Sequence, residues 1–295
     1  MPVQEFQDKA VLQHPSGSSA EVYYYGANVT SWKYDGKERL FLSKKSKLDG
    51  TRAIRGGIPL VFPQFGKASD PSAETAALPQ HGFARTSNWD LSGVINDDES
   101  KVSVEFVLTD SQVSPELISK WPKKFKLTFV VTLTKETLEN TFIVKNEETK
   151  DLSSSFNFHS LLHTYFSVPD ILKVKIHDLN NITYTDKVAN GAKFLEKGDV
   201  IKIDKHTDRV YIDVPASKIH IDTGEEKFIV TKINCKDTVV WNPWIEWSKA
   251  TTDIGDEEYK GMVCVEVGQV TDYVNLKAQE TWKCGQILEV AANVS

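Results

Sequence analysis

FNFHSLLHTYF, residues 156–166, decides the fold class of this chain. The stretch has neither glycine nor proline and is rich in aromatic residues, which favours a buried strand over an amphipathic helix. Side chains of an extended strand point alternately to its two faces. One face would carry Asn157, His159, Leu161, His163 and Tyr165. The other would anchor the strand in a core through Phe156, Phe158, Leu162 and Phe166.

Two histidines in so apolar a strand need polar partners, because burying a polar group without a hydrogen bond is costly. Two interpretations of His159 and His163 stay open: hydrogen-bonded core residues, or a pocket in which one of them donates a proton. Their spacing also occurs in zinc-binding helices, but this stretch does not read as a helix and no third ligand adjoins it. We therefore expect no metal site.

The rest of the chain repeats the strand pattern with period two. Strand-like segments cover residues 21–33 with a bend at Gly26, 39–43, 101–109, 126–134, 137–145, 173–177, 209–214, 218–222, 227–233, 238–241, 262–267 and 282–290. A helix is predicted from Ser114-Pro115 to about Trp121. The pattern predicts an all-β fold, a large antiparallel β-sandwich with few short helices. No repeat or linker is visible, so we expect one domain over residues 1–295.

Composition narrows the class of protein. The formal net charge of −6 and the pI of about 5.7 argue against a nucleic-acid binder with a general basic surface, but leave room for a local arginine cluster. The cysteines Cys235, Cys264 and Cys284 are widely spaced, which indicates free thiols in a reducing compartment. The N-terminus has no apolar signal core, and no apolar run approaches the ~20 residues of a membrane span. We expect a cytoplasmic monomer without membrane or nucleic-acid partners.

Two glycine-containing loops are candidates for ligand binding. RGGIPLVFPQFG, residues 55–66, has three glycines and two prolines. Its Gly56-Gly57 pair could approach a ligand closely, or could form a tight structural turn. PQHGFAR, residues 79–85, ends on Arg85. Arg55 and Arg85 together could hold a phosphate through charge-assisted hydrogen bonds; alternatively, each forms a surface ion pair.

A lone carboxylate stands in the apolar segment GMVCVEVG, residues 261–268. On a strand, Glu266 would share a face with Met262 and Cys264. A half-buried carboxylate is costly unless it is paired or functional, although exposure on an edge strand would also explain it. The segment VWNPW, residues 240–244, could line a sugar-binding surface, but core packing is the favoured role for its tryptophans.

Six motifs, taken in order, resemble those of the hexose-6-phosphate mutarotases. These are the glucose-6-phosphate 1-epimerases of the aldose 1-epimerase (galactose mutarotase-like) superfamily. The motifs are RGGIPLVFPQFG, LPQHGFAR, LHTYF, DRVY, VVWNPW and MVCVEVG. The resemblance spans roughly residues 10–290, and it implies an antiparallel β-sandwich that interconverts the α and β anomers of a hexose 6-phosphate.

The resemblance also implies roles for single residues. His163 matches the general acid of the family and Glu266 its general base. Arg55 and Arg85 match the arginines that would hold the 6-phosphate. Positions expected to contact the sugar hydroxyls or the ring are Gln80, His81 and Asp208. Members of the family often have proline after the glutamate, where this chain has Val267.

The implied reaction opens and recloses the sugar ring, with Glu266 ionised and His163 protonated at the start, and needs no cofactor or metal. A non-catalytic sugar-phosphate sensor on the same scaffold is the alternative, but it need not keep both His163 and Glu266. A glycosidase- or lyase-like enzyme is a further rival, because glycoside hydrolysis uses two carboxylates and Asp208 could be the second.

Overall fold

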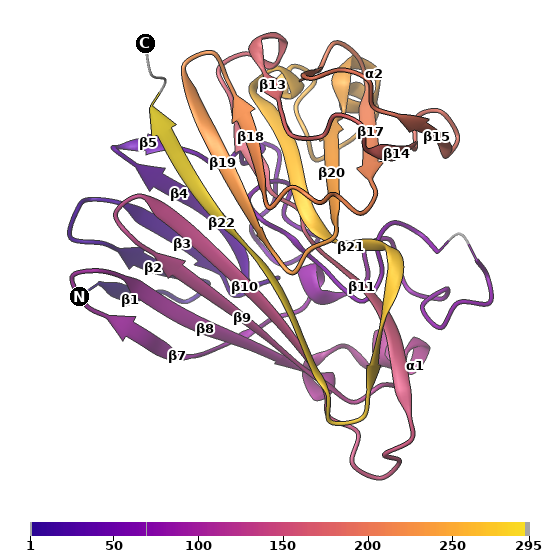
Figure 1. The fold of residues 1–295 in the computed structure, drawn as a ribbon. Coiled ribbons are helices and arrows are strands. Elements are labelled where there is room, and N and C mark those ends of the chain that lie inside the picture. The colour runs from indigo at the N-terminus through magenta and orange to yellow at the C-terminus, as the bar shows by residue number, and fades with distance from the viewer. Residues whose placement is uncertain (1, 69, 293–295) are drawn as a thin grey trace.

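The computed structural model describes residues 2–68 and 70–292 and consists mainly of antiparallel strands (Figure 1), which confirms the predicted fold class. The chain starts in a five-stranded sheet. Its strands are β1 (Val3–Glu5), β2 (Lys9–Gln13), β3 (Ser19–Tyr23), β4 (Asn28–Tyr34) and β5 (Lys37–Glu38).

Two larger sheets follow. The nine-stranded sheet has the order β16 (Ile201–Lys202), β13 (Lys175–Ile176), β18 (Lys218–Asp222), β19 (Glu226–Ile233), β22 (Thr281–Ala292), β10 (Thr137–Asn146), β9 (Phe125–Leu133), β8 (Val102–Thr109) and β7 (Asp90–Asp97). The eight-stranded sheet has the order β15 (Ala192–Leu195), β14 (Thr183–Asp186), β17 (Thr207–Tyr211), β20 (Asp237–Asn242), β21 (Met262–Lys277), β11 (Ser155–Leu162) and β6 (Leu60–Val61), with β12 (Tyr165–Ser167) also paired to β21.

Helical segments are short. The α-helices are α1 (Pro115–Lys120) and α2 (Trp244–Ala250), and 3₁₀ turns cover Ala84–Thr86, Asp110–Gln112, Ile171–Lys173 and Glu258–Gly261. The predicted helix after Ser114 is confirmed as α1, whose first turn is capped because the Ser114 hydroxyl accepts the Leu117 N–H. Among the described residues, no helix combines the length and the apolar character that a bilayer crossing requires.

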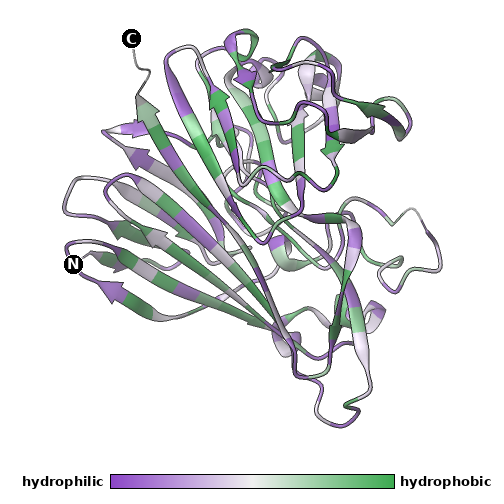
Figure 2. Cartoon of the chain, viewed as in Figure 1, coloured by the Kyte–Doolittle hydropathy of each residue, from purple (hydrophilic) through white to green (hydrophobic). Residues whose placement is uncertain are grey.

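The main hydrophobic core joins all three sheets, because each contributes an apolar face. In β9, for example, the side chains of Leu127, Phe129, Val131 and Leu133 are fully buried. Figure 2 shows apolar and polar residues alternating along such strands. This alternation is the period-two pattern from which the strands were predicted.

The predicted strand over residues 156–166 is interrupted just where chemistry was expected. β11 ends at Leu162 and β12 begins at Tyr165, so His163 lies in a break between two strands. Its backbone N–H donates to the Pro59 carbonyl (3.0 Å), next to the pairing of β11 with β6, and β12 then pairs with β21 in the register that β11 has at Leu162. The strand expected over residues 39–43 is wrong, because these residues make only isolated bridges. Trp244 begins helix α2, which was not predicted.

β21 is the strand that separates core from site. Val263, Val265 and Val267 enter the main core, as the alternation predicts. Met262 and Cys264 lie on the opposite face, in a smaller aromatic cluster. Glu266 follows on that same face by the pleat of the strand. The outer face of the eight-stranded sheet therefore carries the carboxylate.

Candidate active site

All seven candidate site residues line one cavity of about 200 Å³. They are Arg55, Gln80, His81, Arg85, His163, Asp208 and Glu266. The remaining lining residues are Phe65, Lys187, His206, Val239, Trp241 and Trp247. Segments far apart in sequence thus meet here, and the space suits one small molecule rather than a polymer.

His163 and Glu266 face each other at the buried end of the cavity. Nδ1 of His163 lies 3.4 Å from Oε1 of Glu266, and Glu266 is only 1% exposed. Neither His163 Nδ1 nor Glu266 Oε2 has a hydrogen-bond partner among the described residues. The ring of Tyr165 stacks on the His163 ring, with centroids 4.8 Å apart and planes inclined by 10°. The pair is therefore buried, and the Tyr165 ring packs against the imidazole.

Burial shifts the pKa values of both side chains of this pair. It raises the pKa of Glu266 well above its ordinary value, and Asp208 adds to the effect. Burial, together with the charges of Arg85 and Arg55, holds the pKa of His163 well below its ordinary value. Both shifts favour the neutral forms of the two side chains, a protonated Glu266 and an uncharged His163. The implied reaction instead starts from an ionised Glu266 and a protonated His163.

The two arginines also line the cavity and differ in their partners. Arg55 makes a forked ion pair with Asp253, from Nε to Oδ1 (3.2 Å) and from Nη2 to Oδ2 (3.1 Å). Its Nη1 also donates to the Tyr165 hydroxyl (3.2 Å). Burial works to lower the pKa of Arg55, but Tyr165 and Asp253 outweigh it and raise that pKa.

Arg85 has no carboxylate partner among the described residues. Its Nη2 donates to the Gln80 carbonyl (2.9 Å), and its Nε is buried without a partner. Burial and the neighbouring charge of Arg55 lower the pKa of Arg85 to about 10. A cation in this position favours an incoming anion, because the anion would supply the missing counter-charge.

The backbone of residues 79–85 fixes His81 and Arg85. Gly82 has φ +69°, and a Cβ there would lie 2.1 Å from the Phe62 carbonyl oxygen. His81 is held through its Nδ1, which accepts the Gly66 N–H (3.2 Å). A neutral ring with Nδ1 as acceptor carries its hydrogen on Nε2, where it can donate to a ligand.

The glycines of the 55–66 loop serve the backbone rather than a ligand. A Cβ on Gly57 would lie 2.3 Å from the Val29 carbonyl oxygen, and one on Gly56 would lie 2.4 Å from that of Phe41. Of the two interpretations of Gly56-Gly57, the tight structural turn is correct. This turn matters for the site because it positions the preceding residue, Arg55.

Asp208 projects from β17 and is paired with Lys187, whose Nζ lies 3.5 Å from its Oδ2. Burial raises the pKa of Asp208, and Lys187 opposes that shift. The strand β20 separates β17 from β21, so the backbones of Asp208 and Glu266 are two strand spacings, about 10 Å, apart across the sheet. They are also offset along the strands, because Asp208 lies level with Cys264.

His159 does not join this group. It lines a neighbouring cavity of about 510 Å³ and stacks on Tyr273, with ring centroids 4.0 Å apart. Burial lowers the pKa of His159 to about 4. Neither of its ring nitrogens has a partner within the described part of the chain, so the expectation of a hydrogen-bonded core residue is wrong here.

Potential metal ligands occur together at one place in the described residues. Ligand atoms of His163, Cys264 and Glu266 lie within 4.8 Å of one another. Arg55 and Arg85 add positive charge nearby. We therefore assign no metal to these residues.

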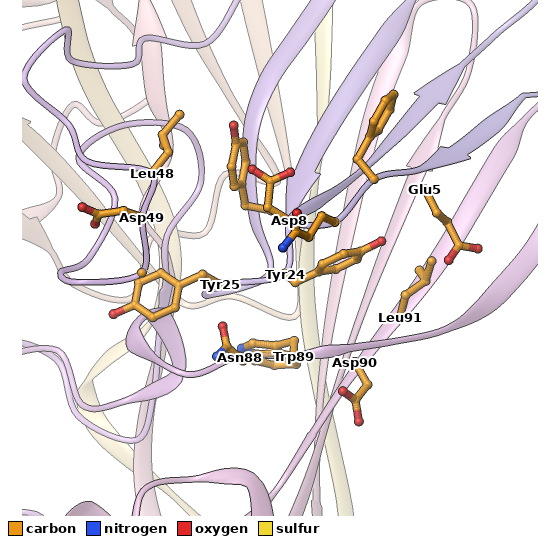
Figure 3. A pocket seen from close by; sticks show the side chains of 14 residues that line it. Glu5, Asp8, Tyr24, Tyr25, Leu48, Asp49, Asn88, Trp89, Asp90 and Leu91 are labelled. Atoms are coloured by element: carbon orange, nitrogen blue, oxygen red, sulfur yellow. The ribbon is translucent and has the colours of Figure 1, made fainter.

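A larger hollow of about 1160 Å³ lies elsewhere on the molecule (Figure 3). The figure shows the carboxylates of Glu5, Asp8, Asp49 and Asp90 around aromatic rings. Its lining contains no lysine, arginine or histidine. Four carboxylates without a basic residue do not suit a phosphate. Size alone therefore does not identify the functional cavity.

Sequence reasoning missed several contributors to the site, and four of them have contacts or charges that matter to the argument. They are Tyr165, Lys187, Trp247 and Asp253. Tyr165 stands within the LHTYF motif, which was a usable signal. Asp253 could not be found, because it pairs with Arg55 across 198 positions. Trp241 lines the cavity, as the weaker of the two interpretations of VWNPW proposed.

Comparison with known proteins shows the family of the chain. Residues 8–289 match the family described as aldose 1-epimerase. A relative from Cenchrus ciliaris, named "Putative glucose-6-phosphate 1-epimerase", is 38% identical over 286 residues, or 94% of this chain and 82% of the relative. One of the same name from Escherichia coli (strain K12) is 31% identical over 96% of this chain and 90% of the relative.

A solved structure is similar to this chain over nearly its whole length. The crystal structure described as a "putative mutarotase" from Salmonella typhimurium superimposes with a TM-score of 0.84. The two sequences are 29% identical, and the match covers 99% of this chain and 93% of the other. The similarity therefore extends over the whole fold, including every strand that supports the cavity.

Proposed function

The chain belongs to the aldose 1-epimerase family, and from this premise we propose that it interconverts the α and β anomers of hexose 6-phosphates. As a member of this family it is an isomerase that acts on carbohydrates. The substrate class and the roles of single residues are our inference from the cavity and from the names of the relatives.

One observation carries the choice of a phosphorylated sugar. Arg85, a cation without a carboxylate partner among the described residues, lines the same cavity as the acid–base pair His163 and Glu266. A phosphate there would accept charge-assisted hydrogen bonds from Arg85 and Arg55. With its far end fixed in this way, the sugar would present its C1 end to the buried pair.

The proposed reaction needs one proton shared by the pair. The Glu266 carboxylate takes the proton of the C1 hydroxyl, the C1–O1 bond becomes a carbonyl, and the C1–ring-oxygen bond breaks. The ring oxygen takes the proton of the His163 imidazolium. Rotation about the C1–C2 bond turns the other face of the aldehyde toward the hydroxyl that was the ring oxygen. The two proton transfers then run in reverse and close the ring. Asp208, Gln80 and His81 would orient the hydroxyls.

Neither alternative function, the sugar-phosphate sensor or the glycosidase-like enzyme, is supported. A sensor would not need His163 and Glu266 to face each other at 3.4 Å, and the matching family is an enzyme family. A glycosidase acting on a polymer needs an extended cleft, whereas this cavity measures about 200 Å³. Asp208 is moreover paired with Lys187, which leaves it poorly suited to serve as a second catalytic carboxylate.

Exchange spectroscopy tests the proposal. We expect magnetisation transfer between the α and β anomeric protons of glucose 6-phosphate to rise strongly with enzyme, and that of free glucose to rise weakly. Binding of glucose 6-phosphate without faster exchange would contradict catalysis. Equal acceleration of both sugars would contradict the phosphate site.

The cytoplasmic, monomeric, single-domain state expected from the sequence also stays a proposal. Sedimentation at several concentrations tests the monomer, and cell fractionation tests the location. A single calorimetric transition would support one domain.

A further inference from the structure

A chain of contacts joins the arginine end of the cavity to its catalytic end. Arg55 donates to the Tyr165 hydroxyl (3.2 Å), and the Tyr165 ring stacks on His163 (4.8 Å). Asp253 balances the charge of Arg55, while no described carboxylate pairs with Arg85. Together, the two arginines and Asp253 therefore carry one uncompensated positive charge, that of Arg85.

The groups that face His163 explain why this charge matters. From β21 come the Glu266 carboxyl, 3.4 Å away, and the Cys264 thiol, and from β12 comes Tyr165. The rings of His81 (5.9 Å) and Trp241 (6.0 Å) close the remaining sides. The cations that act on His163 from farther off are Arg85, Arg55 and Lys187. Apart from Glu266, no described neighbour offers His163 a negative charge.

We propose that an oxyanion bound by Arg55 and Arg85 is the activator of the catalytic pair, so that free inorganic oxyanions switch on mutarotation of hexoses that carry no phosphate. This inference rests on the proposed function of the same cavity. The activators are small tetrahedral dianions such as phosphite and inorganic phosphate. In glucose 6-phosphate the activator is part of the substrate.

The physical reason is a proton that changes place within the pair. Burial raises the pKa of Glu266 and lowers that of His163, which favours a protonated carboxyl beside a neutral imidazole. A neutral imidazole cannot protonate the ring oxygen. A dianion at the arginines cancels the positive potential at His163. The proton then moves from the Glu266 carboxyl to the imidazole, which creates the imidazolium and the carboxylate that ring opening consumes. No proton enters or leaves the site in this step.

Free glucose is the informative substrate, because it supplies no oxyanion. We would measure anomeric exchange of glucose with the wild-type enzyme at pH 7 while raising phosphite, with potassium chloride holding the ionic strength constant. Exchange without enzyme is subtracted, since phosphite itself catalyses mutarotation. We expect a saturable rise of at least about tenfold, the change in proton occupancy that one pKa unit produces. A linear or absent response would overturn the proposal.

Two variants separate activation from general effects of salt. Arg85→Ala removes the uncompensated charge, so phosphite should no longer raise its glucose exchange. Arg52→Ala serves as the matched control, because Arg52 is partly exposed, does not line the cavity and bonds only to the Thr252 hydroxyl among described residues. It should keep the full response. Activation that survives in Arg85→Ala would contradict the inference.

A spectroscopic readout tests the proton directly. In ¹⁵N-histidine-labelled protein without sugar, the His163 signals should be those of a neutral ring at pH 7 and should move toward the protonated form as phosphite is added. His163→Asn assigns the signals, and Arg85→Ala should abolish the movement. An oxyanion that merely ordered the site would leave the protonation state unchanged.

Failure of this inference can be told from failure of the proposed function. If glucose 6-phosphate is turned over but phosphite changes neither glucose exchange nor the His163 signals, the activator role is wrong and the mutarotase assignment stands. If glucose 6-phosphate is not turned over, the proposed function itself fails.

Discussion

Glu266 is the residue on which the proposed chemistry depends most, because it is buried at 1% exposure without a positive partner in contact among described residues. Glu266→Gln keeps the shape of the side chain and removes the base. We expect anomeric exchange of glucose 6-phosphate to fall roughly 10²–10⁴-fold, the usual contribution of such a group. Glucose 6-phosphate binding, measured by calorimetry, should survive.

The matched control for this change is Glu116→Gln on α1, where the carboxylate is 80% exposed. It should leave exchange unchanged. An active Glu266→Gln enzyme would exclude Glu266 as the base, and loss of binding together with activity would indicate a structural rather than a catalytic role.

Arg85 makes a second prediction at the residue scale. Arg85→Ala should lower kcat/KM for glucose 6-phosphate by about 1.5–3 kcal/mol, or roughly 10–150-fold, the range for hydrogen bonds to charged groups. The rate with free glucose should not fall, because glucose has no phosphate to lose. Steady-state coupled assays with both sugars provide the comparison. Equal losses for both sugars would refute the phosphate role.

At the scale of elements, the loop 79–85 places His81 and Arg85 through the close approach of Gly82 to Phe62. Gly82→Ala should lower the free energy of unfolding by about 2 kcal/mol or more, because strain at positive φ adds to a backbone clash. Gly36→Ala is the matched control: its φ is +70° and nothing lies within 4 Å of the added Cβ. It should cost about 1 kcal/mol. Equal losses in urea unfolding would contradict the close-approach argument.

His159 on β11 leads to a prediction about how the stability of the protein depends on pH. His159 has a pKa of about 4 in the folded protein, against about 6.5 unfolded. Its lowered pKa means that the unfolded chain binds the proton first, so stability is lost as pH falls from about 6.5 toward 4. The loss amounts to at most roughly 3 kcal/mol. His159→Gln should flatten this part of the stability–pH curve.

Urea unfolding of wild type, His159→Gln and His177→Gln at pH 7 and pH 5 checks this contribution. His177 is partly exposed and serves as the control, whose curve should follow the wild type. A wild-type difference that persists in His159→Gln would assign the pH dependence to other groups.

The elements themselves could be predicted where the local pattern was regular. β8, β9, β10 and β18 alternate cleanly, and the structure reproduces them within a residue or two. Residues 39–43 alternate as well, but the chain there makes only the isolated bridges of Leu40 and Leu42. β21 continues ten residues beyond its predicted end, past Gly268, because pairing with β11 resumes after a bulge. Local pattern carries no information about such partners.

For the whole molecule, the composition of the site was easier to anticipate than its electrostatics. The motifs named seven residues, and the fold brings all seven to one cavity. The location of the shared proton could not be read from sequence, since it depends on the burial of His163 and Glu266 and on the distance to two arginines. The ion pair of Arg55 with Asp253, which leaves Arg85 as the uncompensated cation, is equally a product of the fold.

The most direct test of the account is a crystal structure of the Glu266→Gln variant with glucose 6-phosphate. The account predicts the phosphate within hydrogen-bond distance of both Arg55 and Arg85, the C1 hydroxyl beside the carboxamide at position 266, and the ring oxygen beside His163. A sugar bound in the reverse direction, or a phosphate held away from the two arginines, would contradict it.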